Sequence, residues 1–149
     1  MRLSGSTLTA LVALAAWFSL DFVGVHGLVD REPLASLAGL MLALMVIFFV
    51  AGVFRVRYTA LVYSVALLIW LWFQIDTHWS TYIMQASQPK LQWYERVFGN
   101  NFRVLPSLAD HTTPDAFHTL LGALILLNLF LATRNLLRST ARDSTTAGA

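Results

Sequence analysis

The chain has 149 residues, of which 57% are hydrophobic and 12% are charged, and its mean hydropathy is +0.63. Soluble domains carry about 25% charged residues, so this composition excludes an ordinary water-soluble domain and indicates a chain surrounded by lipid. The net charge of +2 predicts no nucleic-acid partner, and the lack of cysteine excludes disulfides, thiolate catalysis and cysteine-ligated metals.

Four apolar segments are long enough to cross a bilayer, whose hydrocarbon core of about 30 Å requires about 20 helical residues. The expected fold is therefore an all-α integral membrane protein, a bundle of four transmembrane helices in one domain of residues 1–135. The expected spans cover about residues 8–28, 34–54, 58–75 and 115–135.

The first segment has a second interpretation as a cleaved signal peptide. Arg2 precedes an apolar run in which Ala13, Ala15 and Ala16 offer a cleavage pattern. The apolar run continues well beyond these alanines, which is longer than a signal peptide requires. We therefore interpret the segment as a retained span.

The second segment carries small residues at every fourth position, and in a membrane such a face allows close helix packing. Ala35, Gly39 and Ala43 form this predicted packing face, although an alanine-rich span also produces such spacing by chance. The expected partners are the lipid bilayer and either another membrane protein or a second copy of the chain.

The long connection, residues 76–114, contains a predicted amphipathic helix. From Lys90 to Phe98 the apolar residues fall on one side at helical spacing, which favours a helix lying flat on the membrane surface. This segment either covers helix ends or offers a surface for a partner or ligand. After it, Thr113, Pro114 and Asp115 predict the start of the last helix, with Thr113 as the N-cap.

Arginine placement predicts the orientation. If the spans alternate, six arginines share one side, which the positive-inside rule assigns to the cytoplasm. Both termini are then cytoplasmic, in what we expect to be a bacterial inner membrane, and residues 136–149 form a polar tail predicted to be disordered. The six arginines are Arg2, Arg55, Arg57, Arg134, Arg138 and Arg142.

All four histidines and several acids fall on the predicted outer side, near helix ends. Imidazole and carboxylate groups ligate metal ions, and two histidines ligate haem, so a metal ion or haem is a candidate cofactor with His78, His118, Asp115 and Asp21 as ligands. The alternative is that each side chain makes an ordinary interfacial hydrogen bond, since no spacing matches a metal-ligand motif. The candidate outer cluster is Asp21, His26, Asp76, His78, His111, Asp115 and His118.

Asp21 is the sharpest of these residues, because it lies within the first apolar segment. An ionised carboxylate inside the bilayer is costly, so Asp21 is expected to face the bundle, with His118, His78 or Ser19 as partner. The alternative is a shallow helix whose Asp21 already reaches the headgroups. Asn128 in the last span is expected to donate an interhelical hydrogen bond.

Two functions follow as hypotheses. The first is a non-enzymatic accessory, assembly or immunity-type protein that acts by helix or outer-loop contact with a partner, since no catalytic motif is present. The second is an outer-face metal, haem or proton site that serves metal handling or electron transfer. Transport is the weakest class, because one ionisable residue lies within the spans and no repeat is evident.

Overall fold

The computed structural model describes residues 1–147, with side chains up to residue 139. Apart from two isolated bridges, its regular structure is helical. The helices are α1 (Gly5–Phe18), α2 (Leu20–Val23), α3 (Leu37–Val53), α4 (Thr59–Gln74), the π-helical turn η1 (Ile75–Trp79), α5 (Ser80–Ile83), α6 (Gln88–Phe98) and α7 (Ala116–Ala147).

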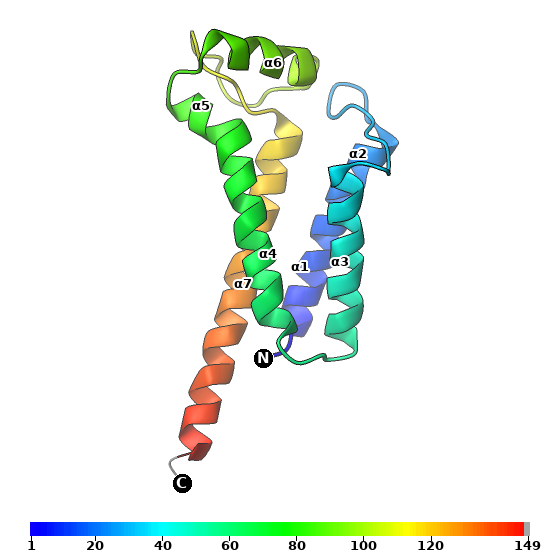
Figure 1. The fold of residues 1–149 in the computed structure, drawn as a ribbon, viewed down its shortest axis with the longest axis vertical. Helices are drawn as coiled ribbons and strands as arrows, with labels where there is room; N and C mark the ends of the chain where they lie inside the picture. The colour runs from blue at the N-terminus through cyan, green and yellow to red at the C-terminus, as the bar shows by residue number, and fades with distance from the viewer. Residues whose placement is uncertain (148–149) are drawn as a thin grey trace.

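The long helices run side by side, and α6 lies across one end of them (Figure 1). Helix α7 packs against both α4 and α1, and α1 packs in turn against α3. We call the end covered by α6 the α6 end. The chain begins at the opposite end, where α3 also connects to α4 and which we call the arginine end.

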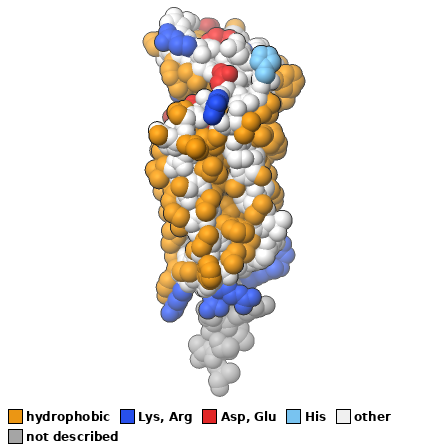
Figure 2. Space-filling view, turned by 90° about the vertical axis from the view of Figure 1, so that its right-hand side faces the viewer, with side chains coloured by type: hydrophobic (Ala, Val, Ile, Leu, Met, Phe, Trp, Pro, Cys, Tyr) orange, Lys and Arg blue, Asp and Glu red, His pale blue; other side chains and the backbone are white. Residues whose placement is uncertain are grey.

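Within the described residues, three helical segments are long and apolar enough to cross a membrane, which suggests a membrane protein: Gly5–Val23, Thr59–Ile83 and Ala116–Ser139. Helix α3, which corresponds to the predicted second span, is apolar but shorter. A wide band of hydrophobic side chains separates the two charged ends of the molecule (Figure 2). This band includes exposed side chains of α3, α4 and α7, among them Leu40, Ile47, Val50, Leu61, Leu68, Ile69, Leu126 and Phe130.

The first two predicted spans are longer than the helices found. The first helical segment ends at Val23, not near residue 28, because Gly24 turns the chain with a φ of +71°. Helix α3 starts at Leu37, with the Ser36 side chain accepting the Gly39 N–H. Ala35 therefore precedes the helix, and the predicted packing face loses its first member.

Gly39 has a local reason to be glycine. A Cβ at this position would lie 1.8 Å from the Leu34 carbonyl oxygen, so the residue allows the chain to fold tightly against the start of α3. Ala43, the last member of the predicted face, is exposed.

The third helical segment is longer than predicted, because it does not stop at the polar residues that follow residue 75. It widens into η1 and continues as α5 to Ile83. Asp76 and His78 therefore lie within this helical segment, and the long connection begins only after it. A π-helical turn of this kind is rare and often occurs at functional sites.

The last two predicted elements are present with shifted ends. The amphipathic helix is found as α6, and its only buried residue is Tyr94. Helix α7 begins after Asp115. The capping residue is therefore Asp115 and not Thr113, which the sequence predicts as the N-cap. The helix extends to Ala147, and so into the segment 136–149 predicted to be disordered, of which residues 148–149 lie outside the described residues.

Asn128 ties three helices together in the core, as the sequence predicts for an interhelical donor. Its Nδ2 donates to the carbonyl oxygen of Ala10 on α1 at 3.0 Å, and its Oδ1 accepts from the Tyr63 hydroxyl on α4 at 2.8 Å. Asn128 is fully buried. These bonds fix α7 relative to its two neighbours and so position the start of α7 at the α6 end.

Candidate functional site

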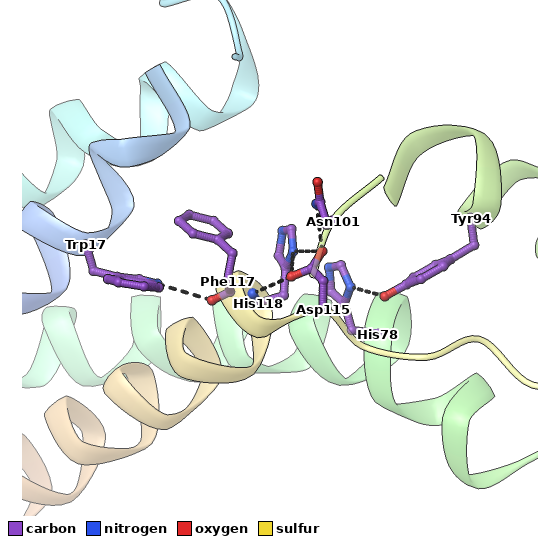
Figure 3. A network of polar contacts seen from close by, with 7 residues as sticks. All are labelled: Trp17, His78, Tyr94, Asn101, Asp115, Phe117 and His118. Atoms are coloured by element: carbon purple, nitrogen blue, oxygen red, sulfur yellow. Dashed lines mark hydrogen bonds and ion pairs between the residues drawn. The ribbon is translucent and has the colours of Figure 1, made fainter. Parts of the chain in front are cut away.

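A buried polar network at the α6 end joins three elements that are far apart in the sequence (Figure 3). His78 comes from η1, Tyr94 from α6, and Asp115 and His118 from the start of α7. These segments meet at this end because α4 runs toward it and leads into η1, while α7 starts there and runs the other way (Figure 1).

Asp115 is the anchor of this network and is completely buried. Its Oδ1 accepts the backbone N–H of His118 at 2.8 Å, which caps α7, and both of its oxygens lie 2.9 Å from His118 Nδ1. Asn101 Nδ2 donates to Oδ2 at 3.0 Å. Burial raises the pKa of Asp115, but the hydrogen bonds from His118 and Asn101 outweigh burial and lower the pKa below its usual value. The side chain is therefore an ionised carboxylate.

This carboxylate sets the tautomer of His118. An ionised carboxylate only accepts hydrogen bonds, so we assign the ring hydrogen to Nδ1, which donates it to Asp115. In the neutral imidazole the second ring nitrogen, Nε2, then presents its lone pair. His118 is held in place but still borders a cavity.

His78 packs against one face of the His118 ring. The two imidazoles stack with ring centroids 4.0 Å apart and an angle of 20° between their planes. His78 is 2% exposed, and its Nδ1 is hydrogen-bonded to the Tyr94 hydroxyl at 2.9 Å. Burial raises the pKa of Tyr94, so its hydroxyl stays protonated. The edge of Phe98 packs on both imidazoles, with centroids 5.1 Å away.

A second contact anchors the first turn of α7 from the side of α1. The indole Nε1 of Trp17 donates to the Phe117 carbonyl oxygen at 3.1 Å, and the two rings stack at 5.6 Å (Figure 3). Phe117 is fully buried. The backbone that carries His118 is thus fixed on both sides.

The cavity beside His118 has a volume of about 340 Å³. Its walls come from α2, from the segment between α2 and α3, from the start of α3, and from α6 and α7. Polar and aromatic residues in these walls are Asp21, Asp30, Glu32, Ser36, Trp93, Phe98, Asn101 and His118.

The structure brings together part of the predicted outer cluster. His78, Asp115 and His118 are in direct contact, and Asp21 borders the cavity next to His118. The other three predicted residues do not join them. His26 and Asp76 are exposed, and His111 instead uses its Nδ1 to bind the Tyr82 carbonyl oxygen at 2.9 Å.

The predicted metal site finds no support in the geometry of the described residues. Within the described residues, no group of three or more histidines and acids is arranged to hold a metal ion. His118 and Asp115 pair directly with each other, an arrangement in which the carboxylate orients the imidazole.

Two members of the network were missed by sequence reasoning. Tyr94 was placed on the apolar side of α6, but that side covers His78 as well as apolar groups. A signal was present, because a buried tyrosine usually finds a hydrogen-bond partner for its hydroxyl. Asn101 carried no such signal, since its role depends on the return of the chain across the α6 end.

Comparison of the chain with known protein families, with curated proteins and with solved structures finds no match. The site itself contains an ionised carboxylate, an imidazole oriented by it and an adjoining cavity. Such a pair is able to accept a hydrogen bond or a proton from a molecule in the cavity.

Proposed function

We propose that this protein is an integral membrane protein that binds a small polar ligand at its α6 end, with His118 Nε2 as the principal contact. The observation that carries the proposal is the hydrogen bond of His118 Nδ1 to the buried Asp115, which leaves Nε2 for the cavity. Preorganised polar groups beside a cavity of a few hundred Å³ are typical of small-molecule sites.

The proposed topology places this site on the outer face. The three long apolar segments and the shorter α3 would all cross a bacterial inner membrane. Lys and Arg side chains gather at the arginine end (Figure 2). By the positive-inside rule that end, with the N-terminus, would be cytoplasmic. The ligand would then enter from outside the cytoplasm.

A binding screen with two histidine variants tests the proposal. Purified protein in an uncharged detergent is heated with small amines, carboxylates, amino acids and sugars, and the shift of the melting temperature is recorded. We expect at least one class to stabilise the protein and His118→Ala to abolish that shift. His111→Ala, whose ring binds a carbonyl oxygen away from the cavity, is the matched control.

Two results would overturn the proposed site. One is that no class of compound stabilises the wild-type protein. The other is that His118→Ala and His111→Ala respond equally to every compound that does.

A second candidate function is lateral contact with another membrane protein or a second copy, as an accessory or immunity-type protein would make. Its supporting observation is α3, in which only Met45 and Gly52 of 17 residues are buried. At 1.5 Å per residue this helix is about 25 Å long, shorter than the hydrocarbon core, and oligomerisation is one response to such a mismatch.

Cysteine cross-linking tests this second candidate, because the chain has no cysteine of its own. A single cysteine in place of the exposed Ile47 on α3 is oxidised in native membranes. We expect a disulfide-linked dimer of the chain, while the matched substitution Leu126→Cys on exposed α7 gives none. Equal cross-linking from both positions would reflect random collision and remove this candidate.

A further inference from the structure

Most of the polar groups around the cavity accept hydrogen bonds or carry negative charge: three are carboxylates, and His118 and Asn101 each keep an acceptor atom. We propose that the ligand of this cavity is a small organic cation with a primary ammonium group. This inference rests on the proposed binding site and adds the chemical class of its ligand.

Three carboxylates border the cavity: Asp21, Asp30 and Glu32. The Glu32 N–H donates to the Asp21 carbonyl oxygen at 2.7 Å, so the segment before α3 is held against α2 and two of these acids are kept near each other. Among the described residues that line the cavity, none is a lysine or arginine. An anionic ligand would therefore meet like charges on entry.

Asp21 points to the ligand most directly. It is only 8% exposed, it borders the cavity, and within the described part of the chain no hydrogen bond to its carboxylate is found. Burying an unpaired carboxylate is costly unless an opposite charge approaches it. The groups that interact electrostatically with Asp21 are one histidine, His118, and two further carboxylates, Glu32 and Asp115. A cation in the cavity would supply the missing donor and charge.

The neutral polar groups also fit an ammonium donor. His118 presents the lone pair of Nε2, because its Nδ1 donates to Asp115. Asn101 uses its Nδ2 on the same carboxylate, which leaves its Oδ1 as an acceptor. An ammonium group carries three donors and no acceptor, so it complements these groups where an alcohol or sugar does so only in part.

Aromatic rings complete the cavity wall. Trp93 and Phe98 line it from α6, and the Trp93 ring already lies 5.2 Å from the ammonium group of Lys90. Aromatic faces attract organic cations. The apolar stem of an alkylammonium ligand would contact these rings while its head reaches Asp21.

A matched pair of probes tests the charge requirement. 1,4-Diaminobutane and 1,4-butanediol have similar length, but only the diamine is a cation. Binding is measured by isothermal titration calorimetry on the full chain in uncharged detergent at low ionic strength. We expect saturable binding of the diamine and none of the diol, and weaker diamine binding at high salt because screening reduces the attraction.

Substitutions then locate the site. Asp21→Asn keeps the size of the side chain and removes its charge, and we expect roughly tenfold or greater loss of diamine affinity, as for a charge-assisted hydrogen bond. Glu32→Gln, on the exposed rim, reduces affinity without the risk of misfolding that accompanies a buried position. Asp76→Asn, an exposed acid outside the cavity, is the matched control and leaves affinity unchanged.

The outcomes separate this inference from the proposed function. Failure of the diamine to bind overturns the ammonium assignment, as does equal binding of the diol or unchanged affinity in both Asp21→Asn and Glu32→Gln. If an anion or a neutral compound instead binds in a manner that depends on His118, the proposed site stands and only its ligand class is wrong. If no compound depends on His118, both fail.

Discussion

His78 and His118 stack face to face, with their ring centroids 4.0 Å apart, although they belong to different helices. The stack holds one face of the His118 ring, while Asp115 holds its Nδ1 edge. His118 therefore cannot turn without losing both contacts. This double restraint is the structural basis for treating its Nε2 as a preorganised group.

Replacing Asp115 with alanine is predicted to lower the free energy of unfolding by about 3 kcal/mol. The change removes the N-cap of α7 and a fully buried carboxylate that pairs with His118. Thermal and denaturant unfolding in detergent measures the effect. Asp76→Ala, at an exposed acid of η1, is the control, and an equal loss in both variants would contradict the assigned role.

Lowering the pH is predicted to remove the contribution of Asp115 to the stability of the folded protein. Its pKa is lowered in the folded protein, whereas that of an unfolded aspartate is about 3.9, so its stabilisation is complete above the unfolded value and declines as pH falls through the folded one. The stability difference between wild type and Asp115→Asn should stay constant from pH 7 to about 5 and shrink below about 4. If this stability difference instead grew as the pH fell, folding would raise the pKa of Asp115 and not lower it.

Replacing Tyr94 with phenylalanine is predicted to cost about 1–3 kcal/mol, because it leaves the buried Nδ1 of His78 without its partner. The same change should loosen α6, which hydrogen–deuterium exchange detects as faster exchange of its amides. Tyr82→Phe removes a hydroxyl with no partner among the described residues. If that control loses as much stability, the bond from Tyr94 has no special role.

Replacing Asn128 with leucine is predicted to destabilise the bundle by about 1 kcal/mol, the scale of interhelical hydrogen bonds in membranes. The Tyr63 hydroxyl would lose its acceptor, so adding Tyr63→Phe should cost little more than the first change alone. Unfolding of the two single variants and the double variant measures this coupling. Strictly additive losses would mean that the two side chains act independently.

The sequence predicts apolar helices well, because lipid-facing and buried side chains are both hydrophobic and give long unbroken runs. It also predicts α6, since that prediction depends on spacing within one helix. Helix ends were predicted less well. The polar stretch at Asp76 and His78 resembled a helix end, yet the helix continues, because His78 is buried beneath Tyr94 of α6.

The convergence of distant residues required the structure. That His78 faces His118 depends on the rotation of each helix about its axis, whereas His26 and His111 lie in connecting segments between helices. An apolar span with little contrast between its faces does not encode that rotation clearly. Ala35 was assigned to a helix that begins two residues later, because the apolar run continues across the position where Ser36 caps the helix.

The wide turn η1 sets the angular phase of everything that follows it on the same helix. Each α-helical residue advances the side-chain direction by about 100°, so deleting Asp76 or Thr77 would rotate His78 and the segment after it by about that angle. The shortened helix would still be long enough to cross a membrane. Its imidazole, however, would swing away from the one on α7, so a length change too small to disturb insertion would separate the two rings.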